Sequence, residues 1–242
     1  MKTLIKKHYY SFVVIGLLLF SVLSCIEIID DGDNDDDNGG NNNPTTVTDI
    51  NGNVYGLVKI GTQTWMTKNL AATVYNDGAP IQHVPDADEW LTIKAPAYCW
   101  YDNKQEVYGR VYGALYNGYA VKTGKLCPQG WHVPSAQEWE TLVNYLGGST
   151  VAGGKLKETG TTHWISPNNG ATNESGFTAL PGGAKYNGTN GYSVGYVGYF
   201  WTTTTGTFPT FLRTFFIHNQ YTQVYNNDND NGYGFSVRCI KN

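Results

Sequence analysis

Residues 126–148, LCPQGWHVPSAQEWETLVNYLGG, specify the start, the buried face and the end of one amphipathic helix. Ser135 is followed three residues later by Glu138, which is the capping-box pattern of a helix N-terminus. The Gly147-Gly148 pair permits a left-handed C-cap. Apolar residues recur between these signals at i, i+3, i+4 and i+7 and form one stripe: Trp139, Leu142, Val143 and Leu146. We therefore expect a helix that packs one face on the core.

His132 precedes this helix and is the residue of the stretch best suited to act as a base or metal ligand. No second His, Cys or Asp stands at helical ligand spacing from it, and Glu138 is already assigned to the cap. We expect His132 to be a hydrogen-bonded structural group. The stretch is then a corner of the fold, with no catalytic residue in it.

The first 24 residues have the pattern of a secretory leader. Three lysines precede an apolar run at residues 12–23, which is shorter than the roughly 20 residues of a spanning helix. The run ends in VLSC, which resembles the lipobox of bacterial lipoproteins. Residues 1–24 are therefore expected to be a lipoprotein signal peptide, and Cys25 the lipidated N-terminus of the mature protein. In the alternative, the leader is an ordinary signal and Cys25 is incidental.

Residues 25–46 form an acidic segment with almost no apolar side chain after Ile29. Such a segment cannot bury enough surface to offset its ordering entropy, so it is expected to be a disordered tether. Its alternate aspartates resemble an EF-hand loop, but Asn38 and Pro44 stand where Gly and Glu are needed for calcium. An acidic stretch after the lipidated cysteine also resembles the surface-export signals of Bacteroidetes lipoproteins. We expect attachment to the outer membrane, facing the cell surface, although a plain solvated spacer gives the same pattern.

The part of the chain after the tether is electrically neutral. Removing the leader's three lysines from the 16 basic residues and the tether's seven carboxylates from the 20 acidic ones leaves 13 of each from Val47 onward. No basic stripe is present to neutralise phosphates. Nucleic acid is therefore not an expected partner.

Three cysteines remain once Cys25 is set aside, an odd number for an exported protein. Strict alternation in the terminal YGFSVRC segment points Cys239 into the core. Cys127 lies just before the helix, which is a fixed place for a partner. We favour a Cys127–Cys239 disulfide, with Cys99 as a buried free thiol inside an aromatic strand.

The composition of 29 Gly, 18 Tyr and 2 Met among 242 residues favours short strands and tight turns. Strands are expected on both sides of Gly61-Thr62 and in AYCWYDN. Tyrosines at i, i+4 and i+7 permit a helix in residues 109–121. The segments FLRTFFIHN, TQVYNN and YGFSVRCI are expected to be consecutive strands of a closing antiparallel sheet. We predict a single α+β domain over residues 47–242 with few helices and long loops.

Four motifs in order make a specific pattern: LCPQGWHVPSAQEWETL, ESGFTALPGG, VGYFWTTT and YGFSVRC. Together they resemble the Fibrobacter succinogenes major paralogous domain, whose usual opening is similar to GNVYGLVKIGTQTWMTKNL. The resemblance covers nearly everything after the tether. It adds little about function, because the biochemical role of the family is unsettled.

The helix start HVPSAQEWETL and the YGFSVRC segment are also similar to sulfatase-modifying, formylglycine-generating enzymes. That resemblance implies a C-type-lectin-like fold with a small twisted antiparallel sheet and long loops. The enzymes' activity does not carry over, since their paired copper-binding cysteines lie in the late loops. Residues 177–238 contain no cysteine here.

Two main classes of function remain open. The first is a lipid-anchored binding module that recognises a glycan or an envelope protein; a structural subunit of an envelope or fimbrial assembly gives the same sequence features. The second is an enzyme of unknown chemistry, which the sparse carboxylates do not favour. The densest acidic group, Asp86, Asp88 and Glu89, has the pattern of another capped helix start. No cofactor and no metal are expected.

The expected ligand surface lies in the late strands and loops, which C-type-lectin-like proteins commonly use. Amides and carboxylates there give directional hydrogen bonds to hydroxyls, and tyrosines offer flat apolar rings with a polar tip. The predicted ligand-binding residues are Arg213, His218, Tyr221, Tyr225, Asn226, Asn227 and Asp228. A solvated hairpin turn is the simpler interpretation of NNDND, and we nevertheless expect a glycan or protein contact here. Calcium is not expected, because Arg238 stands where the loop starting at Asn227 needs Glu.

The lipobox-like ending makes a direct prediction about Cys25. Cys25→Ala is expected to release the protein from the membrane fraction or to block its processing, since the acceptor thiol for the lipid is lost. Palmitate labelling of cells that express each form measures this. Label that persisted in the Cys25→Ala protein would contradict the assignment.

Overall fold

The computed structural model describes residues 45–186, 189 and 191–242. The expected signal peptide, Cys25 and the tether up to residue 44 lie outside the described residues. Thr46 already belongs to the first strand, one residue before the expected domain start at Val47. The described part is a mixed α+β domain with few helices, as predicted. None of its helices combines the length and the apolar character needed to cross a bilayer.

The strands are β1 (Thr46–Thr48), β2 (Val54–Ile60), β3 (Gln63–Met66), β4 (Gln82–His83), β5 (Ala97–Cys99), β6 (Leu115–Asn117), β7 (Trp131–His132), β8 (Val197–Thr205), β9 (Phe211–His218), β10 (Val224–Asp230), β11 (Gly234–Phe235) and β12 (Ile240–Lys241). The helices are α1 (Ala87–Thr92), α2 (Arg110–Tyr112), α3 (Gly118–Lys122), α4 (Ala136–Tyr145) and α5 (Ser149–Leu156), with short helical turns η1 (Tyr101–Asn103) and η2 (Gln105–Gly109).

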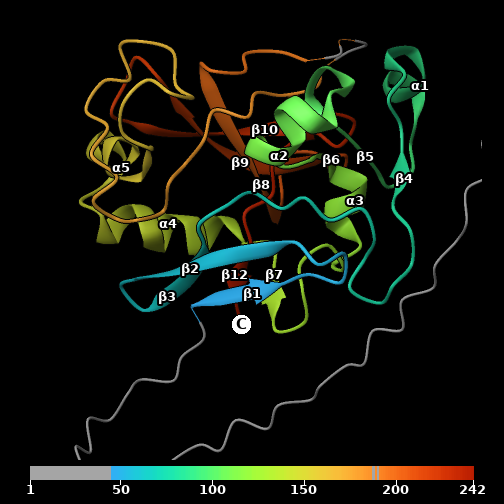
Figure 1. Ribbon diagram of the computed structural model, residues 1–242, viewed down its shortest axis with the longest axis horizontal. Helices are drawn as coiled ribbons and strands as arrows, with labels where there is room; N and C mark the ends of the chain where they lie inside the picture. The colour runs from blue at the N-terminus through green and yellow to red at the C-terminus, as the bar shows by residue number, and fades with distance from the viewer. Residues whose placement is uncertain (1–44, 187–188, 190) are drawn as a thin grey trace, which may run out of the picture. The chain divides into compact units, whose positions relative to one another are not determined.

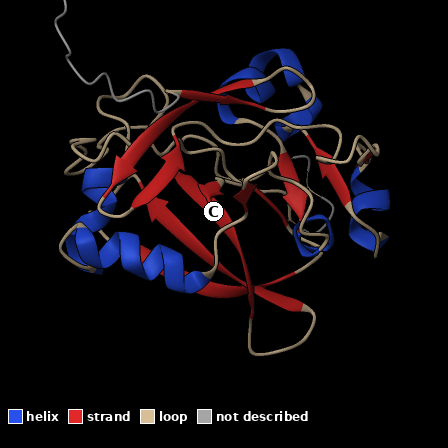
Figure 2. Ribbon diagram, turned by 90° about the horizontal axis from the view of Figure 1, so that it is seen from below, coloured by secondary structure: helices blue, strands red, loops and turns tan. Residues whose placement is uncertain are grey.

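Three small sheets organise the domain, and all their strand pairs except β4 with β5 are antiparallel. Their orders are β1-β2-β3-β12-β7, β10-β9-β8 and β11-β6-β5-β4. In Figure 1 the first sheet lies below the second, and α4 and α5 lie to one side of both. Figure 2 shows the helices at the periphery, with the strands in the middle. The predicted strands on both sides of Gly61 and at Ala97–Cys99 are confirmed as β2, β3 and β5.

Helix α4 begins and packs as the sequence predicts. Ser135 and Glu138 form the complete capping box, and the helix ends before Gly147 and Gly148, which both adopt positive φ. Trp139 is the central side chain of the buried face. Its ring stacks on Phe215 at 5.2 Å and meets the edge of Trp65 at 5.4 Å. Aromatic packing thereby joins α4 to the first and second sheets.

The C-terminal segment, residues 234–241, pairs with all three sheets. Its start pairs with β6 and its end with β3 and β7. Between these, Trp201 of β8 donates its backbone N–H to the carbonyl of Ser236 at 3.1 Å. The expectation of three consecutive strands in one sheet is therefore wrong for this segment, although β9 and β10 do pair. The segment does not lie at the edge of one sheet, because it has hydrogen-bond partners on both of its sides.

Arg238 lies within this segment and is fully buried, with 0% of its surface exposed. Its guanidinium donates to the backbone carbonyls of Met66 at 3.1 Å and Phe177 at 2.6 Å. It donates twice to Asn69 Oδ1, at 3.1 and 2.8 Å, and stacks 4.4 Å from the Phe177 ring. Burial lowers the pKa of Arg238 below its usual range. The predicted inward positions of the segment are confirmed, but Ser236 and Arg238 are buried as well.

Residues 109–121 do not form the single helix that their tyrosine spacing permits. Gly113 has φ of 75° and lies so close to Leu70 that a Cβ would be 2.6 Å from its carbonyl oxygen. The chain therefore turns there, forms β6, and starts again as α3. Asn117 caps α3 by accepting the backbone N–H of Ala120 at 2.9 Å. The three tyrosines therefore belong to three different elements, Tyr112 to α2, Tyr116 to β6 and Tyr119 to α3.

The predicted disulfide is present. Cys127 and Cys239 are bonded across a sequence separation of 112 residues, and Cys99 is a buried free thiol. Closing so long a loop stabilises the fold by up to about 4–5 kcal/mol in the chain-entropy model. The bond holds the C-terminal segment beside the start of α4.

The cage around Arg238 predicts a large stability loss. Arg238→Met keeps an apolar stem but leaves the buried carbonyls of Met66 and Phe177 without donors, so we expect it to lower the free energy of unfolding by about 3–5 kcal/mol. Denaturant titration followed by circular dichroism measures the loss. Arg110→Met, at an exposed position paired only with Glu106, is the control and should change the free energy by less than about 0.5 kcal/mol.

Candidate functional site

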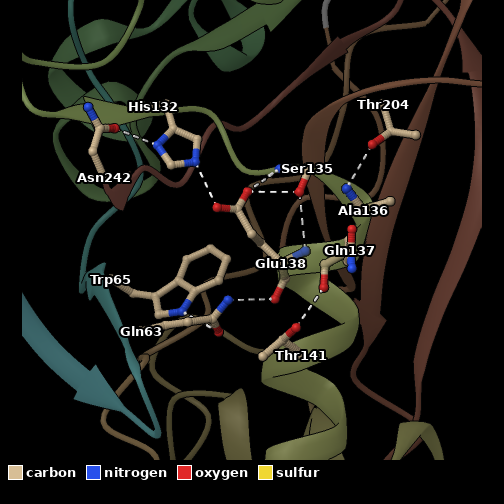
Figure 3. Close-up of polar contacts among 10 residues, drawn as sticks. All are labelled: Gln63, Trp65, His132, Ser135, Ala136, Gln137, Glu138, Thr141, Thr204 and Asn242. Carbon is tan, nitrogen blue, oxygen red and sulfur yellow. Dashed lines mark hydrogen bonds and ion pairs between the residues drawn. The ribbon is translucent and has the colours of Figure 1, made fainter.

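The corner around His132 uses its polar atoms internally (Figure 3). His132 Nε2 lies 2.8 Å from Glu138 Oε1, and its Nδ1 lies 2.6 Å from Asn242 Oδ1. The other carboxylate oxygen of Glu138 accepts the backbone N–H and the hydroxyl of Ser135. Burial acts to raise the pKa of Glu138, but the hydrogen bonds from Ser135 and His132 outweigh it and lower the pKa.

This arrangement is not that of a nucleophilic site. A catalytic serine requires the base to contact its hydroxyl, whereas here the carboxylate lies between Ser135 and His132. Within the described ranges no group of three or more His, Cys, Asp or Glu side chains is arranged to hold a metal ion. The structure therefore supports the prediction that His132 is a hydrogen-bonded structural group.

The predicted ligand residues lie on β9, β10 and the turn between them. NNDND, residues 226–230, belongs to β10 and pairs in unbroken register with β9, so its interpretation as a hairpin turn is wrong. Partners across the ladder include Tyr225 with Phe216 and Asp228 with Arg213. Because side chains alternate along a strand, the register divides the predicted residues between the two faces of the sheet.

One group, Arg213, Asn226 and Asp228, shares the face that packs toward α4. Arg213 donates to Asp228 and, at 3.2 Å, to Asn226 Oδ1. Thr207 also donates to Asp228, through its backbone N–H and its hydroxyl. The hydrogen bonds from Arg213 and Thr207 lower the pKa of Asp228 to about 2. These three side chains fasten the β8–β9 turn to β10 and have few atoms left for a ligand.

The second group lies on the opposite face of the sheet and consists of Tyr225, Asn227 and His218. The ring of Tyr221, from the turn between β9 and β10, contacts the rings of Tyr225 and His218. Phe216 stacks on Tyr225 at 5.2 Å, and Tyr221 meets Tyr225 at 6.1 Å and His218 at 5.4 Å. Tyr221 is 47% exposed. The structure therefore brings together three of the predicted ligand-binding residues, His218, Tyr221 and Tyr225.

Rings from β8 and from the loop before it continue this surface. Tyr199 of β8 lies 5.6 Å from Phe216, and Tyr186 lies 6.1 Å from Tyr199 and 4.7 Å from Tyr233. We call the resulting run of contacting rings the aromatic face: Tyr186, Tyr199, Phe216, His218, Tyr221, Tyr225 and Tyr233. Four of these were not predicted, because only strand pairing brings Tyr199 and Phe216 next to Tyr225.

Lys157 holds the turn at one end of the aromatic face. Its ammonium is buried and donates to three backbone carbonyls, those of Asn169 at 2.8 Å, Tyr221 at 3.0 Å and His218 at 3.3 Å. Burial lowers the pKa of Lys157 to about 8. Burial and the nearby Lys157 charge also lower the pKa of His218, whose Nδ1 accepts the backbone N–H of Gln220. The lowered pKa favours the neutral form of the His218 imidazole, and the hydrogen bonds from Lys157 fix the turn between β9 and β10.

A pocket elsewhere on the domain has polar side chains that are already paired with other protein groups. It has a volume of about 240 Å³ and lies between Tyr55, Trp100, Asn69 and Arg110. Asn69 is already occupied by Arg238 and Tyr112, and Arg110 pairs with Glu106. The pocket shares no residue with the aromatic face. We take the aromatic face as the candidate site.

Residues 58–241 match the family model described as Fibrobacter succinogenes major domain. The chain belongs to the Fibrobacter succinogenes major domain family. The match runs from within β2 to β12, so the matched residues of this chain include Arg238, the disulfide and the aromatic face. No curated protein and no solved structure matches the chain significantly.

The ion pair between Arg213 and Asp228 predicts that the stability of the fold depends on pH. The pKa of Asp228 is about 2 when folded and about 3.9 in an unfolded chain, so its stabilisation is complete above about pH 5 and is lost as the pH falls through 4 toward 2. Asp228→Asn is expected to cost about 1 kcal/mol at neutral pH.

Unfolding titrations of both forms between pH 2 and 7 measure this, and their difference should shrink in the acid range. Glu106→Gln, on an exposed pair, is the control. A difference that stayed constant from pH 7 to 2 would contradict the role given to Asp228.

Proposed function

We propose that this protein is a lipid-anchored binding module of the cell surface that recognises a glycan through the aromatic face. The observation that carries the proposal is the face itself, a run of contacting rings on one side of β8, β9 and β10. Rings supply apolar contact area, and tyrosine hydroxyls add a polar tip. Asn227 is exposed on the same face of β10 and adds an amide donor and acceptor.

The anchor and the surface location rest on the leader. The lipobox-like VLSC and the acidic segment after it support outer-membrane attachment through Cys25. A tether of this length places a folded domain away from the membrane, where a ligand of the cell exterior is accessible. A partner protein of the envelope is the alternative ligand, since Tyr and Asn also suit protein interfaces.

We also propose that the fold is C-type-lectin-like. The first strands and the last strand share one sheet, and a long loop-rich region precedes β8. The proposal also rests on the resemblance of HVPSAQEWETL and YGFSVRC to segments of sulfatase-modifying enzymes. The fold by itself does not specify a ligand.

A glycan array probed with the full chain, purified in detergent, tests the proposed function. We expect Tyr221→Ala and Tyr225→Ala to lower the signal of any bound glycan by at least about tenfold, the effect of roughly 1.4 kcal/mol of lost contact. Tyr145→Ala is the matched control, because Tyr145 is a tyrosine 66% exposed on α4, outside the aromatic face.

Circular dichroism confirms that each variant is folded. An array without any specific signal, or equal signals from Tyr145→Ala and folded Tyr225→Ala, would contradict glycan binding at this face. Capture of an envelope protein by the same face would favour the alternative ligand.

A further inference from the structure

The aromatic face crosses its sheet instead of following one strand. Tyr199, Phe216 and Tyr225 come from β8, β9 and β10 and are direct neighbours in the register. Their ring centroids are 5.6 and 5.2 Å apart. Backbone pairing sets this repeat, since adjacent strands lie about 4.8 Å apart.

The run extends beyond the three strands at both ends. Tyr221 continues it past Tyr225 on one side, and Tyr186 and Tyr233 continue it past Tyr199 on the other. A single pyranose ring is about as long as one step of this repeat and covers one or two aromatic rings. Contact with the whole run therefore requires several sugars joined in an extended chain.

The sheet positions of the face lack formal charge. On the described strands the positions of this face that reach the surface are Tyr199, Phe216, His218, Tyr225, Asn227 and Asn229, whereas Val197, Trp201, Leu212 and Thr214 on the same side of the sheet are buried. The nearest ion pair of these strands, Arg213 with Asp228, is on the opposite side of the sheet. The pKa of His218 is lowered, so its imidazole is neutral at pH 7. A carboxylated ligand would lose hydration on this surface without an exposed cation to pair with, because the nearby Lys157 ammonium is buried and already donates to three carbonyls.

The exposed polar groups suit hydroxyls. Asn227 offers both a donor and an acceptor from an exposed position. Tyr225 donates its hydroxyl to Gln223 at 2.6 Å, which fixes the phenol and leaves its remaining lone pair as an acceptor. Lys157 fixes the turn that carries Tyr221 through its bond to the Tyr221 carbonyl. The Tyr225 phenol and the backbone of Tyr221 are therefore held in place before a ligand arrives, which lowers the entropy cost of binding.

We propose that the ligand of the aromatic face is an extended, uncharged polysaccharide chain that lies across β8, β9 and β10 and is bound along its length. This inference rests on the proposed glycan binding and adds the charge, the length and the direction of the ligand. A face of this kind selects internal segments of neutral polymers over terminal sugars and over uronic-acid chains.

Calorimetric titration of the full chain in detergent tests the inference. The probes are gluco-, xylo- and manno-oligosaccharides, each as the disaccharide and the hexasaccharide, together with oligogalacturonates of the same lengths. We expect at least one neutral hexasaccharide to bind at least about tenfold more tightly than its disaccharide. The oligogalacturonates are expected to bind at least about tenfold more weakly than that hexasaccharide.

Variants assign the binding to the face. Tyr221→Ala and Tyr225→Ala are expected to lower the affinity for the hexasaccharide by at least about tenfold, and Tyr145→Ala is expected to leave it unchanged. Tyr221 is exposed enough for its replacement to leave the fold intact, so a result is available even if Tyr225→Ala is unstable.

The possible failures are distinct. Equal affinity for disaccharide and hexasaccharide would overturn the extended ligand while leaving glycan binding in place. Oligogalacturonates that bound as tightly as neutral chains would overturn the neutral ligand. Absence of binding to every probe, together with an empty glycan array, would overturn the proposed function itself.

Discussion

The guanidinium of Arg238 joins the first sheet to a loop that lies outside the sheets. It joins the end of β3, through Met66, to the loop at Phe177 and to the C-terminal segment that carries it. A buried charge is costly unless its donors are satisfied, and here carbonyl oxygens and Asn69 satisfy them. These hydrogen bonds fix the C-terminal segment relative to β3 and to the loop at Phe177. The disulfide from Cys127 fixes that position from the next residue along.

Two further buried cations work in the same manner. Lys157 donates to three backbone carbonyls, and Lys185 donates to the carbonyl of Pro85 at 3.0 Å and lies 5.1 Å from the Trp90 ring. A domain with few helices and long loops has many carbonyls outside ladders, and buried ones need donors. A long cationic side chain supplies several donors at a distance from its own backbone, three from a lysine and five from an arginine. Cations thus organise loops that the sheets do not reach.

The candidate site depends on this organisation. The aromatic face needs the β8–β9–β10 register to align its central rings, and it needs Lys157 to hold the turn beside Tyr221. On the other side of the same sheet, Trp139 of α4 stacks on Phe215 and keeps the strands in place. The opposite side is buried at Trp201 and Leu212, whereas Tyr199, Phe216 and Tyr225 on that side are only partly buried. These partly buried rings form the aromatic face, which we propose as the binding surface.

The sequence by itself determined what depends on near neighbours. The cap at Ser135, the stripe that includes Trp139, the strands around Gly61 and the disulfide partner Cys239 all follow from short-range spacing and alternation. The helix permitted by tyrosine spacing failed at Gly113, because contact with Leu70, distant in the sequence, requires a turn there. Local patterns carry no information about such contacts.

Only the tertiary structure decided which side chains meet. Alternation alone points Arg238 away from the core, yet it is buried because a second layer covers the outer side of its segment. The predicted ligand residues were contiguous in sequence, and the strand register separated Asp228 from Tyr225 while joining Tyr225 to Phe216 and Tyr199. Residue type and period determine each strand, whereas strand pairing, set by contacts far apart in the chain, determines each surface.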